Sequence, residues 1–383
     1  MRILHLYKDY YPVLGGIENH IRLLAEVQAA LGHDVTVLVT NLGARTAVEQ
    51  VGGVRVIKAG RLATVARAPI SLDFPRLLAR QRPDVAHLHF PYPLGEVSHL
   101  FLGRARRTVI TYHSDVVRQK GWLRLYRPLL WRVLRRADRI VATSPKYVES
   151  SPFLRPLADR CTVIPLGIDL ARFQADRSAE ARDIRARFCT PLPTGDAPDP
   201  LILFVGLLRY YKGLSILLQA MTDIHARLLV IGEGPMAGEW KRMANDLGLN
   251  GRVFFLGEIA NEQLPAFYQA ADMFVLPATQ RSEAFGLVQV EAMASGLPII
   301  STEVGTGTSW VNQHGETGLV VPPGDVQALA LAIRTLLADP ARRRQMGQRG
   351  RERANRDFSR DVMADRVLAL YEELLAGPKV TER

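Results

Sequence analysis

The sequence predicts an α/β protein made of two successive doubly wound units, each a parallel sheet covered by helices. Strand-sized runs rich in Val, Ile and Leu recur along the first half, at positions 2–7, 34–40, 54–58, 84–89, 108–112, 139–143 and 161–165. Between several of these runs the apolar residues follow a helical period, as in the segment that ends before Gly32, a residue typical of a helix end. Strands that alternate with helices indicate parallel sheets with crossover connections.

The alternation restarts after residue 200, with strand-sized runs at 201–206, 227–232, 252–256, 272–276, 298–301 and 318–321. Residues 190–200 contain turn residues without an apolar period, so we expect the domain boundary there. We expect a first domain over residues 1–180, a linker over 181–200 and a second domain over 201–355. A last helix, over residues 356–383, is expected to pack back on the first domain. From residue 325 only helices are expected, with breaks at Asp339-Pro340 and Phe358-Ser359. Tandem units of this kind bind nucleotide-bearing ligands at the carboxyl ends of their strands.

The composition is that of an ordinary globular protein, with 48% hydrophobic and 23% charged residues, which excludes a disordered or fibrous chain. No apolar run reaches the ~18 to 20 residues of a spanning helix, and the apolar start of the chain stops at Lys8-Asp9. We therefore expect neither a membrane span nor a standard secretion signal. Two sparse cysteines, Cys161 and Cys189, indicate packed, reduced thiols in a cytoplasmic protein.

Positive charge is concentrated in the first half of the chain. Residues 1–180 contain 27 Lys and Arg against 15 Asp and Glu, a net charge of +12, whereas residues 181–383 contain 22 against 23, a net charge of −1. Such asymmetry indicates a polyanionic partner, either nucleic acid, an anionic membrane or a phosphorylated substrate.

A basic segment between residues 118 and 139 carries eight cations against the single acid Asp138. On a helical wheel its apolar and basic residues fall on opposite sides, although Pro128 is expected to divide it into two helices. One interpretation is a helix packed on its own sheet with a solvated basic back. The other is a surface for anionic lipid formed by Arg124, Arg132 and Arg135, since each cation near an anionic leaflet contributes about 1 kcal/mol.

Two segments place residues suited to a phosphorylated ligand after the first strand of each unit. Gly15-Gly16 precedes a helix whose backbone amides could approach an anion, although a tight turn also explains the pair and the Gly-x-Gly-x-x-Gly fingerprint is absent. Arg209 and Lys212 follow the strand at 201–206 and could flank a diphosphate, unless they lie in a solvated loop.

A third segment, residues 280–298, places the carboxylate of Glu283 beside Gly286 and that of Glu291 inside a helix that begins near Leu287. The start of that helix would aim free amides at a ligand, and Glu291 could hydrogen-bond a diol such as ribose. By spacing alone, two solvated glutamates explain the pattern equally well.

Together these segments resemble the retaining nucleotide-sugar glycosyltransferases of family four, which have the GT-B fold. The resemblance covers nearly the whole chain. It rests on Gly16 with Glu18, Tyr112-His113-Ser114-Asp115, Val163-Ile164-Pro165-Leu166-Gly167-Ile168-Asp169, Lys212-Gly213, Gly232-Glu233-Gly234-Pro235, and Glu283 followed after seven residues by Glu291. It implies two Rossmann-like domains that face each other across a cleft, and hexosyl transfer with retention of configuration.

The resemblance also implies a role for each matching residue. Lys212 would bind the donor diphosphate, Glu291 the ribose and Glu283 the transferred sugar, while His113 would lie at the sugar and Gly16 would contact phosphate. The implied catalytic residues are His113, Glu283 and Lys212, and the implied donor-binding residues are Gly16, Arg209, Lys212, Glu283, Phe285, Gly286, Leu287 and Glu291.

One position departs from the family pattern. The arginine that commonly follows the glycine of Val-Gly-Arg-Leu is replaced by Leu207. Arg209 could substitute, but a shift of two residues along a strand end moves the side chain by ~6 to 7 Å. Diphosphate contact is therefore expected less of Arg209 than of Lys212.

We expect no metal and no cofactor, because cations and backbone amides can stabilise a departing diphosphate and the acidic pair Asp-x-Asp is absent. The histidines show no convincing ligand set. His87 and His89 alternate on a predicted strand, and Glu96 with His99 is a lone Glu-x-x-His, so ordinary strand and helix residues are expected.

Residues 209–213 and 305–310 resemble bacterial enzymes of lipopolysaccharide O-antigen and exopolysaccharide synthesis, which implies a mannosyl or deoxyhexosyl donor such as GDP-mannose. The expected partners are the nucleotide sugar, a polyprenyl-diphosphate-linked sugar acceptor and the anionic inner face of the cytoplasmic membrane. Nucleotide-sugar epimerases and phosphorylases share the fold and remain an alternative. A basic nucleic-acid-binding protein is a second, but no helix-turn-helix or RNA-binding signature is present, so no nucleic acid is expected.

Overall fold

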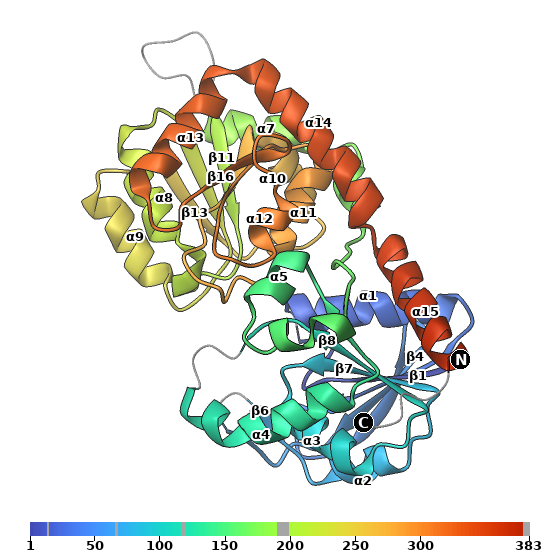
Figure 1. The fold of residues 1–383 in the computed structure, drawn as a ribbon. Helices are drawn as coiled ribbons and strands as arrows, with labels where there is room; N and C mark the ends of the chain where they lie inside the picture. Colours follow the sequence, from blue (N-terminus) through green and yellow to red (C-terminus); the bar gives the residue numbers. More distant parts are fainter. Residues whose placement is uncertain (14, 66–67, 116–119, 190–198, 378–383) are drawn as a thin grey trace. The chain divides into compact units, whose positions relative to one another are not determined.

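The computed structural model describes residues 1–13, 15–65, 68–115, 120–189 and 199–377, without the side chains of 120–123 and 125. The chain folds into two compact units, each described by itself. Unit 1 comprises Met1–Gly167 with Arg360–Arg383, and unit 2 comprises Ile168–Ser359. Each unit is a largely parallel sheet with helices on both faces, so the predicted α/β class with two Rossmann-like domains is confirmed (Figure 1).

Within the described residues, unit 1 contains an eight-stranded sheet in the order β10-β9-β8-β7-β1-β2-β4-β3. Only β3 runs antiparallel to its neighbour. Because both faces are covered, the central strands are almost entirely buried. Sequence analysis missed β3 and the separate β5–β6 hairpin, whose residues are largely exposed. The strands are β1 Arg2–Leu6, β2 Asp34–Thr40, β3 Ala47–Val51, β4 Val54–Ala59, β5 Ala63–Val65, β6 Ala68–Ile70, β7 Val85–Phe90, β8 Arg107–Tyr112, β9 Arg139–Ala142 and β10 Cys161–Val163.

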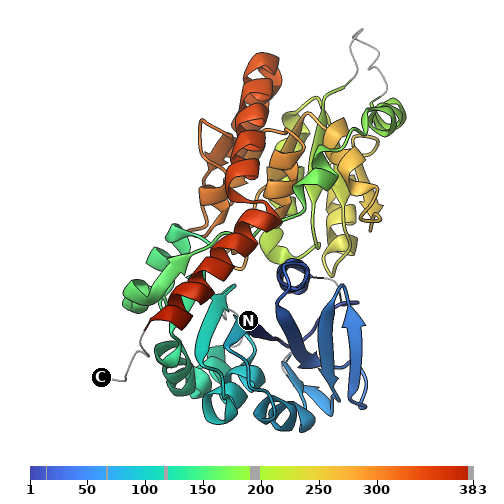
Figure 2. The ribbon, with the colours of Figure 1, turned by 90° about the vertical axis from the view of Figure 1, so that its right-hand side faces the viewer.

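Helices cover both faces of this sheet (Figures 1 and 2). On one face α1 (Gly16–Ala30) packs against α15 (Arg360–Ala376), and on the other lie α2 (Asp73–Ala79), α3 (Pro93–Leu102) and α4 (Lys120–Arg136). The short helices α5 (Pro145–Ser150) and η1 (Arg155–Arg160) precede β10. As the sequence predicts, α1 ends just before Gly32, which has a positive φ of 86°.

Helix α4 runs through Pro128 without a break, so the predicted division into two helices is wrong. The exposed ring of Pro128 meets solvent, while Leu130, Val133 and Leu134 are buried in the C-terminal half of the helix. Burial of three aliphatic side chains, each worth about 1.5 to 3 kcal/mol, offsets the ~3 kcal/mol cost of an internal proline.

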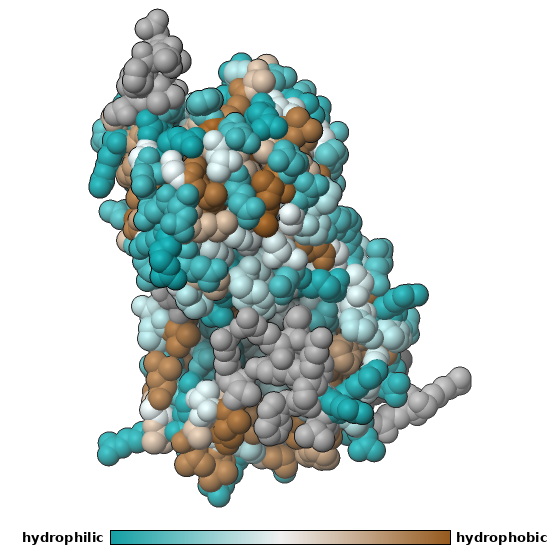
Figure 3. All heavy atoms as spheres, turned by 90° about the vertical axis from the view of Figure 1, so that its left-hand side faces the viewer, coloured by the Kyte–Doolittle hydropathy of each residue, from teal (hydrophilic) through white to brown (hydrophobic). Residues whose placement is uncertain are grey.

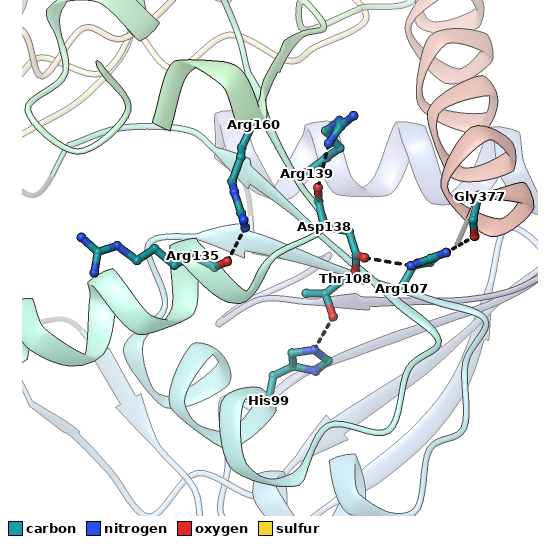
Figure 4. Close-up of polar contacts among 8 residues, drawn as sticks. All are labelled: His99, Arg107, Thr108, Arg135, Asp138, Arg139, Arg160 and Gly377. Carbon is teal, nitrogen blue, oxygen red and sulfur yellow. Dashed lines mark hydrogen bonds and ion pairs between the residues drawn. The ribbon is translucent and has the colours of Figure 1, made fainter. Parts of the chain in front are cut away.

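The C-terminal end of α15 is tied to the amino ends of strands in unit 1 (Figure 4). Arg107 forms an ion pair with Asp138 at 3.2 Å and donates a hydrogen bond to the carbonyl oxygen of Gly377. Asp138 also accepts a hydrogen bond of 2.7 Å from the backbone N–H of Thr108, whose hydroxyl contacts His99 Nε2 at 3.0 Å. These interactions hold the end of the chain on the sheet formed by its beginning.

The boundary between the units differs from the expected one, which placed the first domain over residues 1–180 and a linker over 181–200. Helices α6 (Leu170–Gln174) and α7 (Ser178–Phe188) already belong to unit 2, where α7 packs on α10 (Leu264–Ala270). Arg185 on α7 donates to the carbonyl of Ala270 at 2.7 Å and pairs with Asp272 at 3.0 Å. The turn-rich stretch 190–198 lies outside the described residues, and the helix before it has its tertiary partners in unit 2.

Unit 2 contains a six-stranded parallel sheet in the order β13-β12-β11-β14-β15-β16. Helices α8, α9 and α13 lie on one face, around the buried Trp240, and α10, α11 and α14 lie on the other. The strands are β11 Leu201–Val205, β12 Arg227–Ile231, β13 Val253–Gly257, β14 Met273–Leu276, β15 Ile299–Thr302 and β16 Gly318–Val321. The further helices are η2 Tyr210–Lys212, α8 Leu214–Ala220, η3 Met221–Asp223, α9 Ala237–Asp246, α11 Leu287–Ala294, α12 Thr308–Val311, α13 Val326–Ala338 and α14 Pro340–Asp357.

After β16 the described chain is helical only, and both predicted breaks are confirmed. Asp339 separates α13 from α14 and caps α14, because its carboxylate accepts a hydrogen bond of 2.9 Å from the backbone N–H of Arg342. Phe358 and Ser359 separate α14 from α15. No helix in the described part of the chain combines the length and the apolar character needed to cross a bilayer.

The packing of α14 predicts opposite effects for two glycines on that helix. A Cβ at Gly347 would lie 1.9 Å from the backbone oxygen of Gly296, which cannot move aside, whereas a Cβ at Gly350 would meet only the side chain and Cα of Met293 at 3.4 Å or more. We expect Gly347→Ala to lower the free energy of unfolding by about 1 to 3 kcal/mol. Gly350→Ala should raise it by about 0.5 to 1 kcal/mol through helix propensity. Urea denaturation of both variants tests this, and equal effects would contradict the packing described.

Candidate active site

Two loops of unit 2 follow adjacent strands at the point where the strand order reverses. One follows β11 and carries Lys212, and the other follows β14 and carries Glu283. The carboxyl ends of parallel strands share one edge of a sheet, and open α/β sheets bind ligands at this edge where the order reverses. The loops meet closely, because a Cβ on Gly213 would lie 1.9 Å from the carbonyl oxygen of Pro277.

Lys212 and Glu283 form a buried ion pair at this edge, with 2.6 Å between Nζ and Oε2. Each residue is only 8% exposed. Burial lowers the pKa of Lys212, but the charge and hydrogen bond of Glu283, together with the charges of Tyr211 and Glu291, outweigh this effect, and the net pKa is raised. Lys212 therefore keeps a full positive charge away from bulk water, where a charge acts most strongly on a ligand.

Glu291 lies on α11, one helical turn after its first residue, Leu287. Its carboxylate accepts a hydrogen bond of 2.7 Å from the hydroxyl of Tyr268 on α10. Burial raises the pKa of Glu291, while the Tyr268 hydrogen bond and the charges of Arg172 and Lys212 lower it. Glu283 and Glu291 both help to keep Lys212 charged, so the structure brings the three predicted residues together. Sequence analysis missed Tyr268, which no local pattern distinguishes from an ordinary core tyrosine.

Gly286 allows α11 to begin beside these carboxylates. Its φ of 77° is in the left-handed region, and a Cβ there would lie 2.7 Å from Gln289 Nε2. Leu287 is the first helical residue, as predicted. Phe285 is different: its ring is buried and packs on Phe358 and Trp310 at centroid distances of 5.9 and 6.5 Å. The predicted donor contact of Phe285 can therefore involve its backbone, but its side chain belongs to the core.

The departure at Leu207 lies on the surface, since this side chain is 53% exposed. Arg209, the suggested substitute, is half-buried at the start of η2, and its carbonyl accepts a hydrogen bond of 2.9 Å from the Lys212 backbone N–H. The structure thus places Arg209 and Lys212 on the same short turn, with the lysine buried and the arginine partly open to solvent.

In unit 1, Gly16 is itself the first residue of α1, whereas the sequence predicted that the glycine pair precedes the helix. The carboxylate of Glu18 lies over the same helix start, because a Cβ at Gly15 would come within 2.1 Å of Glu18 Oε2. Burial raises the pKa of Glu18, and a hydrogen bond with its own backbone N–H lowers it. A carboxylate of the chain itself therefore occupies the region above the first turn of α1.

His113 follows β8 and belongs to a buried cluster of five histidines, together with His5, His20, His87 and His89. His89 Nδ1 is 3.1 Å from His113 Nε2, and His89 Nε2 is 3.0 Å from His5 Nδ1. His87 and His89 lie on strand β7, as expected, but sequence analysis did not predict that they join a buried histidine cluster. Two triads in the described residues, His5-His87-His89 and His20-His89-His113, bring three nitrogens within 4.8 Å of one another. The alternation of His87 and His89 on β7, beside His5 on β1, could have indicated the cluster.

The same triads contain imidazole nitrogens only, without a carboxylate or thiolate. Burial lowers the pKa of each of the five rings, of His5 to about 4 and of His20 to about 3. The cluster is therefore neutral near pH 7, and hydrogen bonds join His5, His89 and His113.

The predicted basic surface lies on α4, where Arg124, Arg132 and Arg135 are exposed. A cavity of about 810 Å³ in unit 1 runs along α3, α4 and η1, and Arg132, Arg135 and Arg160 are among its lining residues. Thr108 and Asp138 also line this cavity, which therefore lies at the amino ends of β8 and β9 (Figure 4). The C-terminal end of α4, with Arg132 and Arg135, is thus at the opposite edge of the sheet from His113.

Comparison with known proteins gives a consistent result over the whole chain. The family model described as Glycosyltransferase Family 4 matches residues 14–172, and that described as Glycosyl transferases group 1 matches residues 194–353. O-antigen chain mannosyltransferase C of Escherichia coli is 37% identical over 380 residues, which cover 98% of this chain and 99% of that protein. D-rhamnosyltransferase WbpZ of Pseudomonas aeruginosa is 38% identical over 364 residues, which cover 94% and 92%.

Solved structures agree with this result. Sucrose-phosphate synthase from Thermosynechococcus elongatus matches with a TM-score of 0.80 at 27% identity, over 98% of this chain and 100% of that one. The fold, the two family models and relatives matched nearly end to end together assign the chain to family 4 of the glycosyltransferases, with the GT-B fold.

Proposed function

We propose that this enzyme transfers a hexose from a nucleotide-diphosphate sugar, GDP-mannose or a GDP-deoxyhexose by preference, to a lipid-linked glycan, with retention of configuration. The reaction would serve the synthesis of a cell-surface polysaccharide. The similarity of this chain to an O-antigen mannosyltransferase and to a D-rhamnosyltransferase supports the proposed class of sugar. An epimerase or phosphorylase of the same fold has no comparable support.

The observation that carries the proposal is the buried Lys212–Glu283 pair beside Glu291. When a nucleoside diphosphate leaves a sugar, negative charge develops on the diphosphate while the sugar becomes oxocarbenium-like. A lysine held charged in a dry environment stabilises the departing diphosphate before and after bond cleavage. In our proposal the reaction needs no metal, because Lys212 and the amides of η2 and α11 supply this stabilisation.

Each carboxylate then has its own partner. We assign Glu283 to a hydroxyl of the transferred sugar, since its pairing with Lys212 places it next to the diphosphate charge. We assign Glu291 to the ribose hydroxyls, because Oε2 accepts the hydrogen bond from Tyr268 and Oε1 has no hydrogen bond from the described residues. His113 is assigned to the transferred sugar and Gly16 to a phosphate, which would displace the carboxylate of Glu18 from the start of α1.

We further propose that unit 1 binds the anionic inner surface of the cytoplasmic membrane, where polyprenyl-diphosphate-linked acceptors lie. Arg124, Arg132 and Arg135 would contact lipid headgroups, and the cation-lined cavity beside α4 could hold one. Apolar side chains are exposed at the end of α3, which packs on α4: Phe101 is 66% exposed and Leu102 41%. Figure 3 shows such hydrophobic side chains among hydrophilic ones on the surface of unit 1. A mixed basic and apolar surface is typical of interfacial binding.

The proposed reaction is tested with a panel of nucleotide sugars. A true donor present at 100 times its dissociation constant should stabilise the protein by ~2.7 kcal/mol, which a thermal-shift measurement detects. The preferred donor is then incubated with a lipid-linked acceptor analogue, and proton NMR identifies the anomer of the product. Release of a free epimer without glycosyl transfer, or a product of inverted configuration, would refute the proposed reaction.

Substitution of the two carboxylates should change different kinetic constants. Glu291→Ala removes a charged acceptor for the ribose and should raise the donor KM, by the equivalent of about 1.5 to 3 kcal/mol. Glu283→Ala should chiefly lower kcat. Tyr268→Phe is the matched control, because it removes the partner of Glu291 but leaves the carboxylate, so donor KM should change far less than in Glu291→Ala. Wild-type kinetics in both glutamate variants would remove the assignment.

Lys212 and Arg209 should also be separable by kinetics. Lys212→Ala should raise the donor KM and lower kcat, because the diphosphate is negative both before and after departure. It also leaves Glu283 buried without its partner, so circular dichroism must first show that the variant is folded. Arg209→Ala should have the smaller effect, since that side chain is partly solvated. The reverse order would show that Arg209 has taken over the role of the missing arginine at position 207.

Membrane binding should depend on α4. The wild-type protein should float with anionic liposomes at low salt and detach as salt is raised, because exposed charges are screened. Changing Arg124, Arg132 and Arg135 to Glu should abolish flotation while activity on a soluble acceptor analogue persists. The matched control changes three exposed arginines of unit 2, Arg182, Arg334 and Arg344, to Glu. A wild-type protein that stays at the bottom of the gradient would refute the proposal.

A further inference from the structure

A continuous chain of hydrogen bonds leads from His113 to an amide on α1. His113 Nε2 lies 3.1 Å from His89 Nδ1, His89 Nε2 lies 3.0 Å from His5 Nδ1, and His5 Nε2 lies 2.8 Å from Gln28 Oε1. The four side chains come from the loop after β8, from β7, from β1 and from α1, and each is at most 4% exposed. The chain therefore crosses unit 1 without contact with solvent.

The direction of these hydrogen bonds follows from their last member. A neutral imidazole has one N–H and one bare nitrogen, and burial lowers the pKa of all three rings well below neutrality. A carbonyl oxygen only accepts, so His5 Nε2 carries the proton and its Nδ1 is bare. His89 Nε2 must then donate to His5, and His113 Nε2 must donate to His89. The same logic leaves Nδ1 of His113 as a bare acceptor.

We propose that Gln28 is a positioning residue that fixes the tautomer of His113 through His5 and His89, so that Nδ1 of His113 accepts a hydrogen bond from a hydroxyl of the donor sugar. This role rests on the proposed function. Nδ1 of His113 is buried and has no hydrogen-bond partner among the described residues, which is the state expected of an acceptor whose partner is a ligand. In the other tautomer this nitrogen would present an N–H, and the same hydroxyl would have to turn and accept.

A metal ion cannot share this arrangement. The His20-His89-His113 triad has its ring nitrogens close enough for one ion, but a metal ligand must be unprotonated. His89 Nδ1 and His113 Nε2 share one proton in the hydrogen bond between them, so neither nitrogen can bind an ion while that hydrogen bond persists. A hydrogen-bonded chain and a metal centre are therefore exclusive, and elemental analysis of the purified protein separates them.

The tautomers can be measured without any substrate. In ¹⁵N-labelled wild-type protein, long-range proton–nitrogen correlation spectra should show His113 as the Nε2–H form, with a bare nitrogen at Nδ1. Loss of one set of signals in His113→Asn assigns the ring. Gln28→Met, which fills a similar volume without a strong acceptor, should lower the ratio of the two tautomers by about tenfold, the population that one hydrogen bond controls.

Two further variants show whether the effect is specific to Gln28. Gln28→Glu, measured in alkaline buffer where the carboxylate accepts as the amide oxygen does, should restore the wild-type tautomer. Thr111→Val is the matched control: it removes the partner of His87 Nε2, a buried bond of 2.6 Å in the same cluster but outside the chain. It should leave His113 unchanged.

A protonated Nδ1 in wild-type His113, an unchanged tautomer in Gln28→Met, or one tightly bound zinc ion per chain by elemental analysis would each overturn the inference. In kinetics, Gln28→Met should lower kcat by about tenfold at unchanged donor KM, and Gln28→Glu should recover it. If the tautomers behave as expected but no nucleotide sugar is turned over, the proposed function fails while the positioning of His113 stands. If turnover is found but the tautomers do not respond, only the role of Gln28 fails.

Discussion

The ion pair between Lys212 and Glu283 is the interaction on which the proposed chemistry of unit 2 depends. An isolated lysine buried to this degree would lose its proton, since desolvation disfavours the charged form. The carboxylate of Glu283, 2.6 Å away, together with Tyr211 and Glu291, outweighs this effect and keeps the ammonium charged. The pair in turn requires two loops to touch, which only glycine at position 213 allows. A donor diphosphate would thus meet a lysine that is already desolvated and charged in the folded protein, so binding would not have to remove its water.

The buried histidine cluster of unit 1 consists of neutral groups, unlike the ion pair of unit 2. Strands β1 and β7 carry histidines on one face, beneath α1 and α15, where charged residues would be costly to bury. Hydrogen bonds satisfy the chain from His113 to Gln28 and impose one direction on it. The contrast between the units is therefore electrostatic: unit 2 holds a buried ion pair, which we propose meets phosphate, and unit 1 holds a buried neutral imidazole, which we propose accepts a hydrogen bond from a hydroxyl group.

The opposite edge of unit 1 has another character. There Arg107 is compensated by Asp138 and by the end of α15, so it serves the fold (Figure 4). The arginines of α4 lie instead on the solvent side of a helix whose other side is buried. Exposed cations such as these are accessible to an external anion, which is the role that our proposal gives to the excess charge of the first half of the sequence.

The sequence by itself determined the class of fold, the family and the candidate residues of the donor site. Strand and helix periods are local, and so are the glycines before α1 and α11, and Lys212, Glu283 and Glu291 stand at the ends of elements that these periods define. Such local patterns do not show which segments distant in the sequence come into contact. Tyr268 reaches Glu291 from another helix, and the ring of Phe285 turns into the core. The histidine chain joins residues 23 to 84 positions apart. Only the tertiary structure decided these contacts, because crossover connections, and not sequence spacing, set which side chains share a buried face.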